Sequence, residues 1–196
     1  GVAFTVDLLG EATVSAQEAA DYERRYLDLI ENLAAECGRW DAQPELERDA
    51  FGPIARVNVS IKLSSLDSQI NPLSHEESVR RLVERLRPLF RRARELGVFL
   101  NLDMEHYALK GLTLDAYMDL LSEPEFAGYH AGCVIQAYLR DAEADTERII
   151  AWARRTGQIA TVRLVKGAYW DQETIEAEQH GWPVPVWTDK AATDAC

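Results

Sequence analysis

The chain has 196 residues, of which 47% are hydrophobic and 28% charged, so it is long enough for one domain with a real core. Its net charge of -12 disfavours a nucleic-acid surface in this segment, and no apolar run approaches the roughly 20 residues that cross a bilayer. The three cysteines form no CxxC pair, which fits a reducing cytoplasm, and the histidines lack the spacing of metal ligands.

The first predicted strand is residues 2–9, and because it starts at the second residue the sequence looks cut from a longer one. Ser15 and Glu18 have the spacing of a capping box, and apolar residues at helical spacing follow them. A helix is therefore predicted from Ser15 to Gly38. Residues 40–55 are polar and broken by glycine and proline, which predicts a long loop.

The second predicted strand, residues 56–63, carries Lys62 near its C-terminal end. Ser74 and Glu77 form a second capping box that opens a helix. Pro88 lies inside this helix and should kink it, because proline lacks the N–H that the helix needs.

A third strand is predicted at residues 98–105, with Asp103 toward its end, and Thr113 is expected to cap a short helix after it. The fourth strand covers residues 132–139 and contains Gln136. The helix after it should start at Asp141 or Asp145, stop at Gly157, and face three large apolar residues inward: Ile149, Ile150 and Trp152.

Residues 160–170 are the most informative stretch. They begin as a β-branched apolar run, which is typical of a strand buried on both faces, yet Arg163 and Lys166 interrupt it. These cations either pair with neighbouring carboxylates or bind a ligand, because burying an unpaired cation costs several kcal/mol. Gly167 then allows close backbone approach, and Tyr169 follows it. Beyond this stretch we expect a helix at residues 171–179 and an extended segment at residues 181–188.

Strands and helices that alternate in this way predict an α/β fold with a parallel sheet, either an open doubly wound sheet or a (β/α)8 TIM-like barrel. An open dinucleotide-binding fold should carry GxGxxG after its first strand, and the sequence has none. Polar residues instead recur near the C-terminal ends of successive strands, where barrel enzymes place their chemistry: Lys62, Asp103, Gln136 and Arg163. We therefore predict a barrel with about the first five of its βα units present.

A ligand at this mouth would meet positive charge and hydrogen-bonding groups. Arg163 and Lys166 suit a phosphate, a carboxylate or an electron-rich ring edge, and Gln136 can donate and accept at a heteroaromatic edge. Asp103 could pair with Lys62 or with Arg163. Because no Ser-His-Asp set, P-loop or acid pair is visible, the chemistry is expected to belong to a bound cofactor.

Six stretches in this order resemble the FAD-dependent proline dehydrogenases: FTVDLLGEA at 4–12, VSIKLSSL at 59–66, NLDMEHY at 101–107, VIQAYLRD at 134–141, RLVKGAYW at 163–170 and GWPVPVWTDKAATDAC at 181–196. The tryptophan after GAY and the GWPV segment are closest to the proline dehydrogenase domain of bacterial bifunctional proline-utilisation proteins. The resemblance runs over essentially the whole chain.

This resemblance implies a distorted (β/α)8 barrel that holds FAD non-covalently and oxidises L-proline to Δ1-pyrroline-5-carboxylate. Electrons would pass from the flavin to a quinone, which implies a cytoplasmic protein in peripheral contact with the membrane. A fused or partner pyrroline-5-carboxylate dehydrogenase, of the aldehyde dehydrogenase kind, is a further implied partner.

The resemblance also implies roles for individual residues. The cofactor would contact Gln136, Arg163, Val165, Lys166, Gly167, Ala168, Trp170, Thr188 and Lys190. Proline would be bordered by Lys62, Asp103, Leu164 and Tyr169. The catalytic residues would be Lys62, Asp103, Arg163 and Tyr169. Residues expected to serve structure alone are Asp7, Glu11, Tyr107, Tyr138 and Cys133.

Two rival interpretations remain open. Lys62 or Lys166 could be the nucleophile of a Schiff-base aldolase on a TIM barrel. The chain could also be a non-catalytic fragment, because the arginine pair with which the family holds the proline carboxylate has no counterpart in this sequence. We therefore expect residues 1–196 to be a partial barrel domain, lacking its C-terminal part, that does not bind proline normally on its own.

Overall fold

The computed structural model describes residues 2–10, 12–50 and 52–195. Five strands form a parallel sheet in the order β1-β4-β5-β6-β7. The strands are β1 (Val6–Asp7), β4 (Asn58–Ile61), β5 (Phe99–Leu102), β6 (Ala131–Gln136) and β7 (Ala160–Val165). Strands β1, β4, β5 and β7 lie within their predicted ranges, and β6 begins one residue earlier than predicted. The predicted α/β class with a parallel sheet is confirmed.

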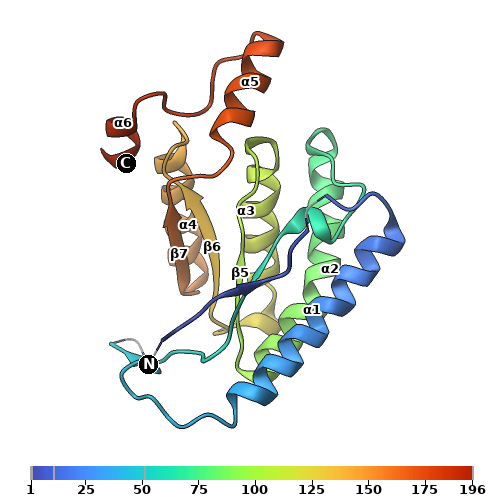
Figure 1. Ribbon diagram of the computed structural model, residues 1–196, viewed down its shortest axis with the longest axis vertical. Coiled ribbons are helices and arrows are strands. Elements are labelled where there is room, and N and C mark those ends of the chain that lie inside the picture. Colours follow the sequence, from blue (N-terminus) through green and yellow to red (C-terminus); the bar gives the residue numbers. More distant parts are fainter. Residues whose placement is uncertain (1, 11, 51, 196) are drawn as a thin grey trace.

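The helices are α1 (Ala16–Cys37), α2 (His75–Leu96), α3 (Tyr107–Leu121), α4 (Ala142–Thr156), α5 (Trp170–His180) and α6 (Lys190–Ala195). Figure 1 shows α1 to α4 following one another along one side of the sheet, whereas α5 and α6 lie beyond the C-terminal ends of β6 and β7. Single 3-10 turns are η1 (Leu63–Ser65), η2 (Pro72–Ser74) and η3 (Pro124–Phe126). No helix in the described part of the chain is long and apolar enough to cross a membrane.

The core lies between the sheet and these helices. Strand side chains alternate between the two faces, and the helix-facing ones of β4, β5 and β6 are buried and apolar, such as Val59, Ile61 and Leu100. They pack with Phe90 of α2 and Tyr117 of α3 in one hydrophobic cluster. The alternate positions face the other side of the sheet, where no described helix packs, and many of them are polar.

Two of the predicted helix starts differ in their outcome. For α1 the capping prediction is confirmed, because the Ser15 hydroxyl accepts a hydrogen bond from the Glu18 amide at 3.2 Å. For α2 it is wrong: Ser74 makes no side-chain cap, and the Asn71 side chain instead accepts from the Leu73 amide at 2.9 Å and starts the turn η2. Helix α2 then continues past Pro88 to Leu96.

Helix α3 begins at Tyr107, earlier than the predicted cap at Thr113. The Thr113 hydroxyl bonds the Leu109 carbonyl inside the helix at 3.0 Å, so it caps nothing. The Tyr107 amide at the true start donates to the carboxylate of Glu173, which comes from α5. Because this cap lies 66 residues away in the chain, no local pattern could have indicated it.

The prediction that residues 160–165 are buried on both faces is wrong. In β7, Val162 is 38% and Leu164 is 61% exposed, because no described strand pairs with the outer edge of β7. Ile150 is also exposed, so the prediction that it faces inward is wrong, whereas Ile149 and Trp152 are buried as predicted.

The predicted loop at residues 40–55 contains a small antiparallel hairpin of β2 (Arg48–Asp49) and β3 (Gly52–Pro53). Glu11, which was expected to serve structure, lies outside the described residues, as do Gly1, Phe51 and Cys196. Cys133 is fully buried in the core, as expected, and burial raises the pKa of its thiol to about 12.

Candidate active site

The polar residues expected at one edge of the sheet are indeed brought to it. Lys62 directly follows β4, Asp103 directly follows β5, and Gln136 is the last residue of β6. Arg163 lies within β7, opposite Val134 of β6. Because the strands are parallel, these four side chains come from the C-terminal halves of neighbouring strands or from the residues just after them.

Arg163 and Asp103 form the centre of the site. The Arg163 guanidinium pairs with the Asp103 carboxylate, and a second guanidinium nitrogen donates to the Ser60 hydroxyl at 3.3 Å. The same Asp103 oxygen accepts a hydrogen bond from the Asn101 side-chain amide at 3.2 Å. The Asp103 side chain is only 15% exposed. Arg163 is therefore held at a fixed place on the uncovered face of the sheet.

Lys62 lies between two carboxylates. Its ammonium is 2.8 Å from Asp7 Oδ2 and 3.8 Å from Asp103 Oδ2. Burial disfavours the ammonium, but the hydrogen bond to Asp7 and the negative charges of Asp7 and Asp103 outweigh this, so the pKa of Lys62 is raised. The same hydrogen bond lowers the pKa of Asp7. Two cations and two carboxylates thus form one charge-balanced network.

Asp7 is the member of this network that was not predicted to belong to the site. It was expected to serve structure alone, but it ends β1 and reaches Lys62 across the sheet. One signal could have identified it: like Lys62 and Asp103, it is a charged residue at the end of an apolar strand. Ser60 and Asn101, which hold Arg163 and Asp103, gave no comparable signal because they lie inside predicted strands.

The loop after β7 approaches the β6 side of the site closely. Gly167 has φ of +124°, and a Cβ built on it would lie 2.4 Å from Cε1 of the Tyr138 ring. The Tyr138 amide also donates to the Lys166 carbonyl at 2.9 Å. Tyr138 packs as expected, and burial raises the pKa of its hydroxyl to about 12. Only glycine fits at position 167.

Gln136 offers an unsatisfied acceptor beside this loop. The residue is buried, and its side-chain oxygen has no hydrogen-bond partner among the described residues. A buried polar atom without a partner costs roughly 1–3 kcal/mol, and a ligand N–H would remove this cost. A heteroaromatic ring edge with an N–H group has the chemistry that this acceptor needs.

The segment before α6 is tied to the same end of the sheet. The Trp170 indole N–H donates to the Trp187 carbonyl at 2.9 Å, and the Arg140 guanidinium lies 4.6 Å from the centre of the Trp187 ring. The Trp187 amide donates to the Tyr138 carbonyl at 2.7 Å. These contacts place the start of α6 beside the loop after β7, as Figure 1 also shows.

Lys166 and Lys190 meet at this point, although 24 positions separate them in the sequence. Both ammonium groups pair with the carboxylate of Asp194 in α6. Both lysine side chains are largely exposed. Two cations that converge on one anion form a local positive site suited to phosphate oxygens.

The remaining predicted site residues can be located by the element in which they lie. Leu164 lies between Arg163 and Val165 in β7, so alternation turns its side chain to the face opposite Arg163. Ala168 and Tyr169 lead into α5, near Gly167. Thr188 lies just before α6. The roles of all of these residues stay predictions.

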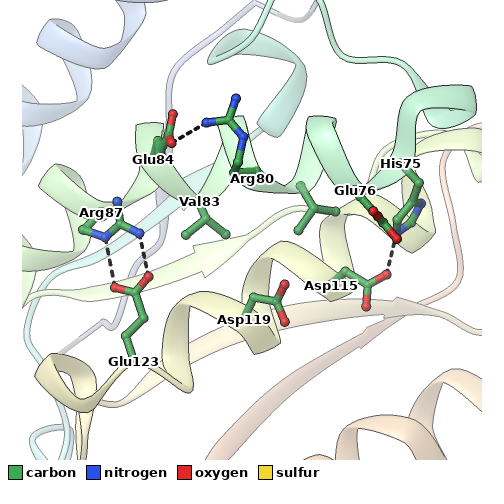
Figure 2. A pocket seen from close by; sticks show the side chains of 10 residues that line it. His75, Glu76, Arg80, Val83, Glu84, Arg87, Asp115, Asp119 and Glu123 are labelled. Atoms are coloured by element: carbon green, nitrogen blue, oxygen red, sulfur yellow. Dashed lines mark hydrogen bonds and ion pairs between the residues drawn. The ribbon is translucent and has the colours of Figure 1, made fainter.

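Two of the ligand-sized hollows among the described residues bear on where the site lies. One, of about 950 Å³, lies toward the N-terminal ends of the strands, where Val98, Tyr129 and Ile159 line it, and it reaches the described network only at Asn101 and Arg163. The other, of about 540 Å³, lies between α2 and α3 and is shown in Figure 2. Its charged groups largely pair with one another, as Arg87 does with Glu123 at 2.6 Å. We therefore place the site at the sheet and not in this groove.

Comparison with known proteins decides the family. The family model described as proline dehydrogenase matches residues 1–196. The chain belongs to the proline dehydrogenase family. This confirms the resemblance drawn from the six sequence stretches, and the family is one of oxidoreductases.

Relatives with known names show how much of a larger protein the chain corresponds to. The bifunctional protein PutA of Salmonella typhimurium is 34% identical over 197 residues, which cover 99% of this chain and 14% of the relative. The proline dehydrogenase of Deinococcus radiodurans is 28% identical over 175 residues, covering 89% of this chain and 47% of that protein. The chain thus spans only part of these relatives.

The structure is also similar to solved ones. Proline utilization A (PutA) from Bdellovibrio bacteriovorus, in a form inactivated by N-propargylglycine, has 53% sequence identity and a TM-score of 0.95. The match covers 98% of this chain and 20% of that one. PutA from Corynebacterium freiburgense has 35% identity and a TM-score of 0.83, covering 100% of this chain and 19% of that one.

Proposed function

We propose that this chain is part of an enzyme that oxidises L-proline to Δ1-pyrroline-5-carboxylate with FAD as the hydride acceptor. The observation that carries the proposal is the network of Lys62, Asp103 and Arg163 at the ends of parallel strands, in a member of the proline dehydrogenase family. The site gathers fixed cations next to a loop that only glycine allows to form.

The same reasoning favours a closed, distorted (β/α)8 barrel in which residues 1–196 form a partial domain. Parallel sheets are almost always covered on both faces, yet here one face carries polar side chains and no described helix. The outer edge of β7 exposes backbone and the apolar side chains of Val162 and Leu164. Further strands between β7 and β1 would pair this edge and turn the polar face into the barrel interior.

The residues present fit FAD. Gln136 offers its unsatisfied oxygen to a ring edge, Gly167 lets the backbone approach closely, and Lys166 and Lys190 offer positive charge to phosphate oxygens. Val165, Ala168, Trp170 and Thr188 are the further residues that we propose to hold the cofactor. When bound, FAD would supply the acceptor for the hydride that leaves the substrate.

The residues of this chain supply orientation and charge. Arg163, held by Asp103 and Ser60, would offer a fixed positive charge to the bound flavin, which would favour its uptake of electrons. Lys62 offers an ammonium to the carboxylate of the amino acid. Tyr169 would supply apolar surface for its ring, whereas Leu164 points to the face of the sheet opposite Arg163.

Partners follow from the relatives and are likewise proposals. The relatives named bifunctional protein PutA favour a second activity in the same chain or complex, and we propose a pyrroline-5-carboxylate dehydrogenase that consumes the product. We propose a quinone as the final electron acceptor, reached by peripheral contact of a cytoplasmic protein with the membrane.

The test is proline-dependent reduction of a soluble quinone analogue by the full-length protein, with identification of the product. Arg163→Met should reduce turnover at least tenfold, because it removes the fixed charge. Arg154→Met, on the exposed last turn of α4, is the control and should have no effect. Covalent trapping of a substrate on Lys62 or Lys166 by borohydride would instead support the aldolase.

A further inference from the structure

Asp7 makes the shortest ion pair of Lys62. Their side-chain atoms are 2.8 Å apart, whereas the other carboxylate near Lys62, that of Asp103, is 3.8 Å away. The Lys62 side chain is 15% exposed, so few water molecules can replace a lost partner. The ammonium position therefore depends on Asp7 more than on any other described carboxylate.

The surroundings of Lys62 show why a second carboxylate is needed. Asp103 is already engaged by the Arg163 guanidinium and the Asn101 amide. The Tyr26 hydroxyl of α1 faces the Lys62 backbone amide at 3.4 Å. Without Asp7, Lys62 and Arg163 would compete for a single carboxylate, and the ammonium would move toward β5.

We propose that Asp7 is a positioning residue that holds the Lys62 ammonium on the β1 side of the site, away from the Arg163–Asp103 pair. This inference rests on the proposed function, in which Lys62 meets the carboxylate of the substrate. Asp7 acts through Lys62 and touches neither substrate nor cofactor. Asp7 keeps the two cations apart, so that Lys62 is available to the substrate carboxylate and Arg163 to the flavin that accepts the hydride.

The consequence is a defined kinetic signature. Asp7→Asn removes the charge and keeps the shape, so Lys62 loses its fixed place and the KM for L-proline should rise roughly tenfold, the effect of losing one hydrogen bond to a charged group. The kcat should fall by much less, because Arg163 keeps its own partners. Asp7→Glu restores the carboxylate and should recover part of the loss.

A double-mutant cycle tests whether Asp7 acts through Lys62. In the full-length holoprotein, Asp7→Asn should have little effect once Lys62→Met is present. Glu31→Gln is the matched control, since it removes one carboxylate from an exposed ion pair with Arg92 on the outer helices. It should leave KM unchanged.

A readout independent of turnover separates this inference from the proposed function. The pKa of Lys62, followed by NMR of the labelled lysine side chains, should fall in Asp7→Asn and stay unchanged in Glu31→Gln. If the wild-type protein does not oxidise proline, the proposed function fails, while this titration still tests the Asp7–Lys62 contact. An unchanged Lys62 pKa, or an equal loss from Asp7→Asn with and without Lys62, would overturn the inference.

Discussion

Replacement of Gly167 by alanine tests whether the close approach of the loop after β7 to Tyr138 shapes the site. The change adds one methyl group at a position with φ of +124°, where it would lie 2.4 Å from the Tyr138 ring. Two costs follow, one from the backbone conformation and one from the overlap with a ring that is itself buried.

The magnitude can be worked out by treating the two costs separately. A non-glycine residue held in a sparsely populated backbone region costs on the order of 1–3 kcal/mol. An extra methyl group in a packed site costs typically a further 1–3 kcal/mol. We therefore expect Gly167→Ala to lower the free energy of unfolding by about 2–6 kcal/mol, or to displace the loop and weaken FAD binding.

Gly157→Ala is the matched control. Gly157 also has positive φ, at +72°, but nothing lies within 4 Å of the place where its Cβ would be, so this variant should show the backbone cost alone. Denaturant unfolding and FAD titration of both variants, with and without Tyr138→Leu, isolate the steric part. Equal losses for Gly167→Ala and Gly157→Ala, unaffected by Tyr138→Leu, would refute the reasoning.

Three further predictions concern single polar side chains. Lys110→Met leaves two carboxylates without the buried cation that now lies 2.6 Å from each, so the urea midpoint should fall by the equivalent of about 3 kcal/mol. Burial raises the pKa of Glu173 above 4.5, so the contribution of this group to the wild-type free energy of unfolding is full below pH 4.5 and is lost as pH rises through the raised pKa. The stability of Glu173→Gln relative to the wild type should therefore increase with pH in denaturant titrations, and a constant difference would contradict this. Ser60→Ala removes a hydrogen bond to Arg163 and should weaken FAD binding by about 1 kcal/mol, measured by titration.

Much of the framework could be predicted because its causes are local. The spacing of Ser15 and Glu18 and the glycine at 157 mark helix ends through a side-chain cap and left-handed backbone, which depend on neighbouring residues only. Alternation of strands and helices was enough to predict the parallel sheet, because a crossover helix leaves few other arrangements.

The errors arose where distant segments decide the outcome. The start of α3 depends on Glu173 of α5, which its local sequence does not contain. Exposure of β7 depends on which strand lies beside it, whereas its β-branched residues indicate only that it is a strand. Ser74 has the sequence of a cap, but the turn made by Asn71 takes its place.

Four site residues could be predicted from their type and from their positions near strand ends: Lys62, Asp103, Gln136 and Arg163. How these side chains pair could not be predicted. The sequence left open whether Asp103 holds Lys62 or Arg163, and the structure shows contact with both, at different distances. Asp7 was missed as a site residue because a carboxylate on the first strand resembles a residue that starts a loop. Only the parallel pairing of β1 with β4 brings it to Lys62.

The central claim is that this site serves the oxidation of proline by a bound flavin. The most direct measurement is the absorbance spectrum of the purified full-length protein before and after L-proline is added without oxygen. We predict a flavin band that bleaches when proline is added. A flavin band that stays oxidised, or the absence of any flavin band, would contradict the account.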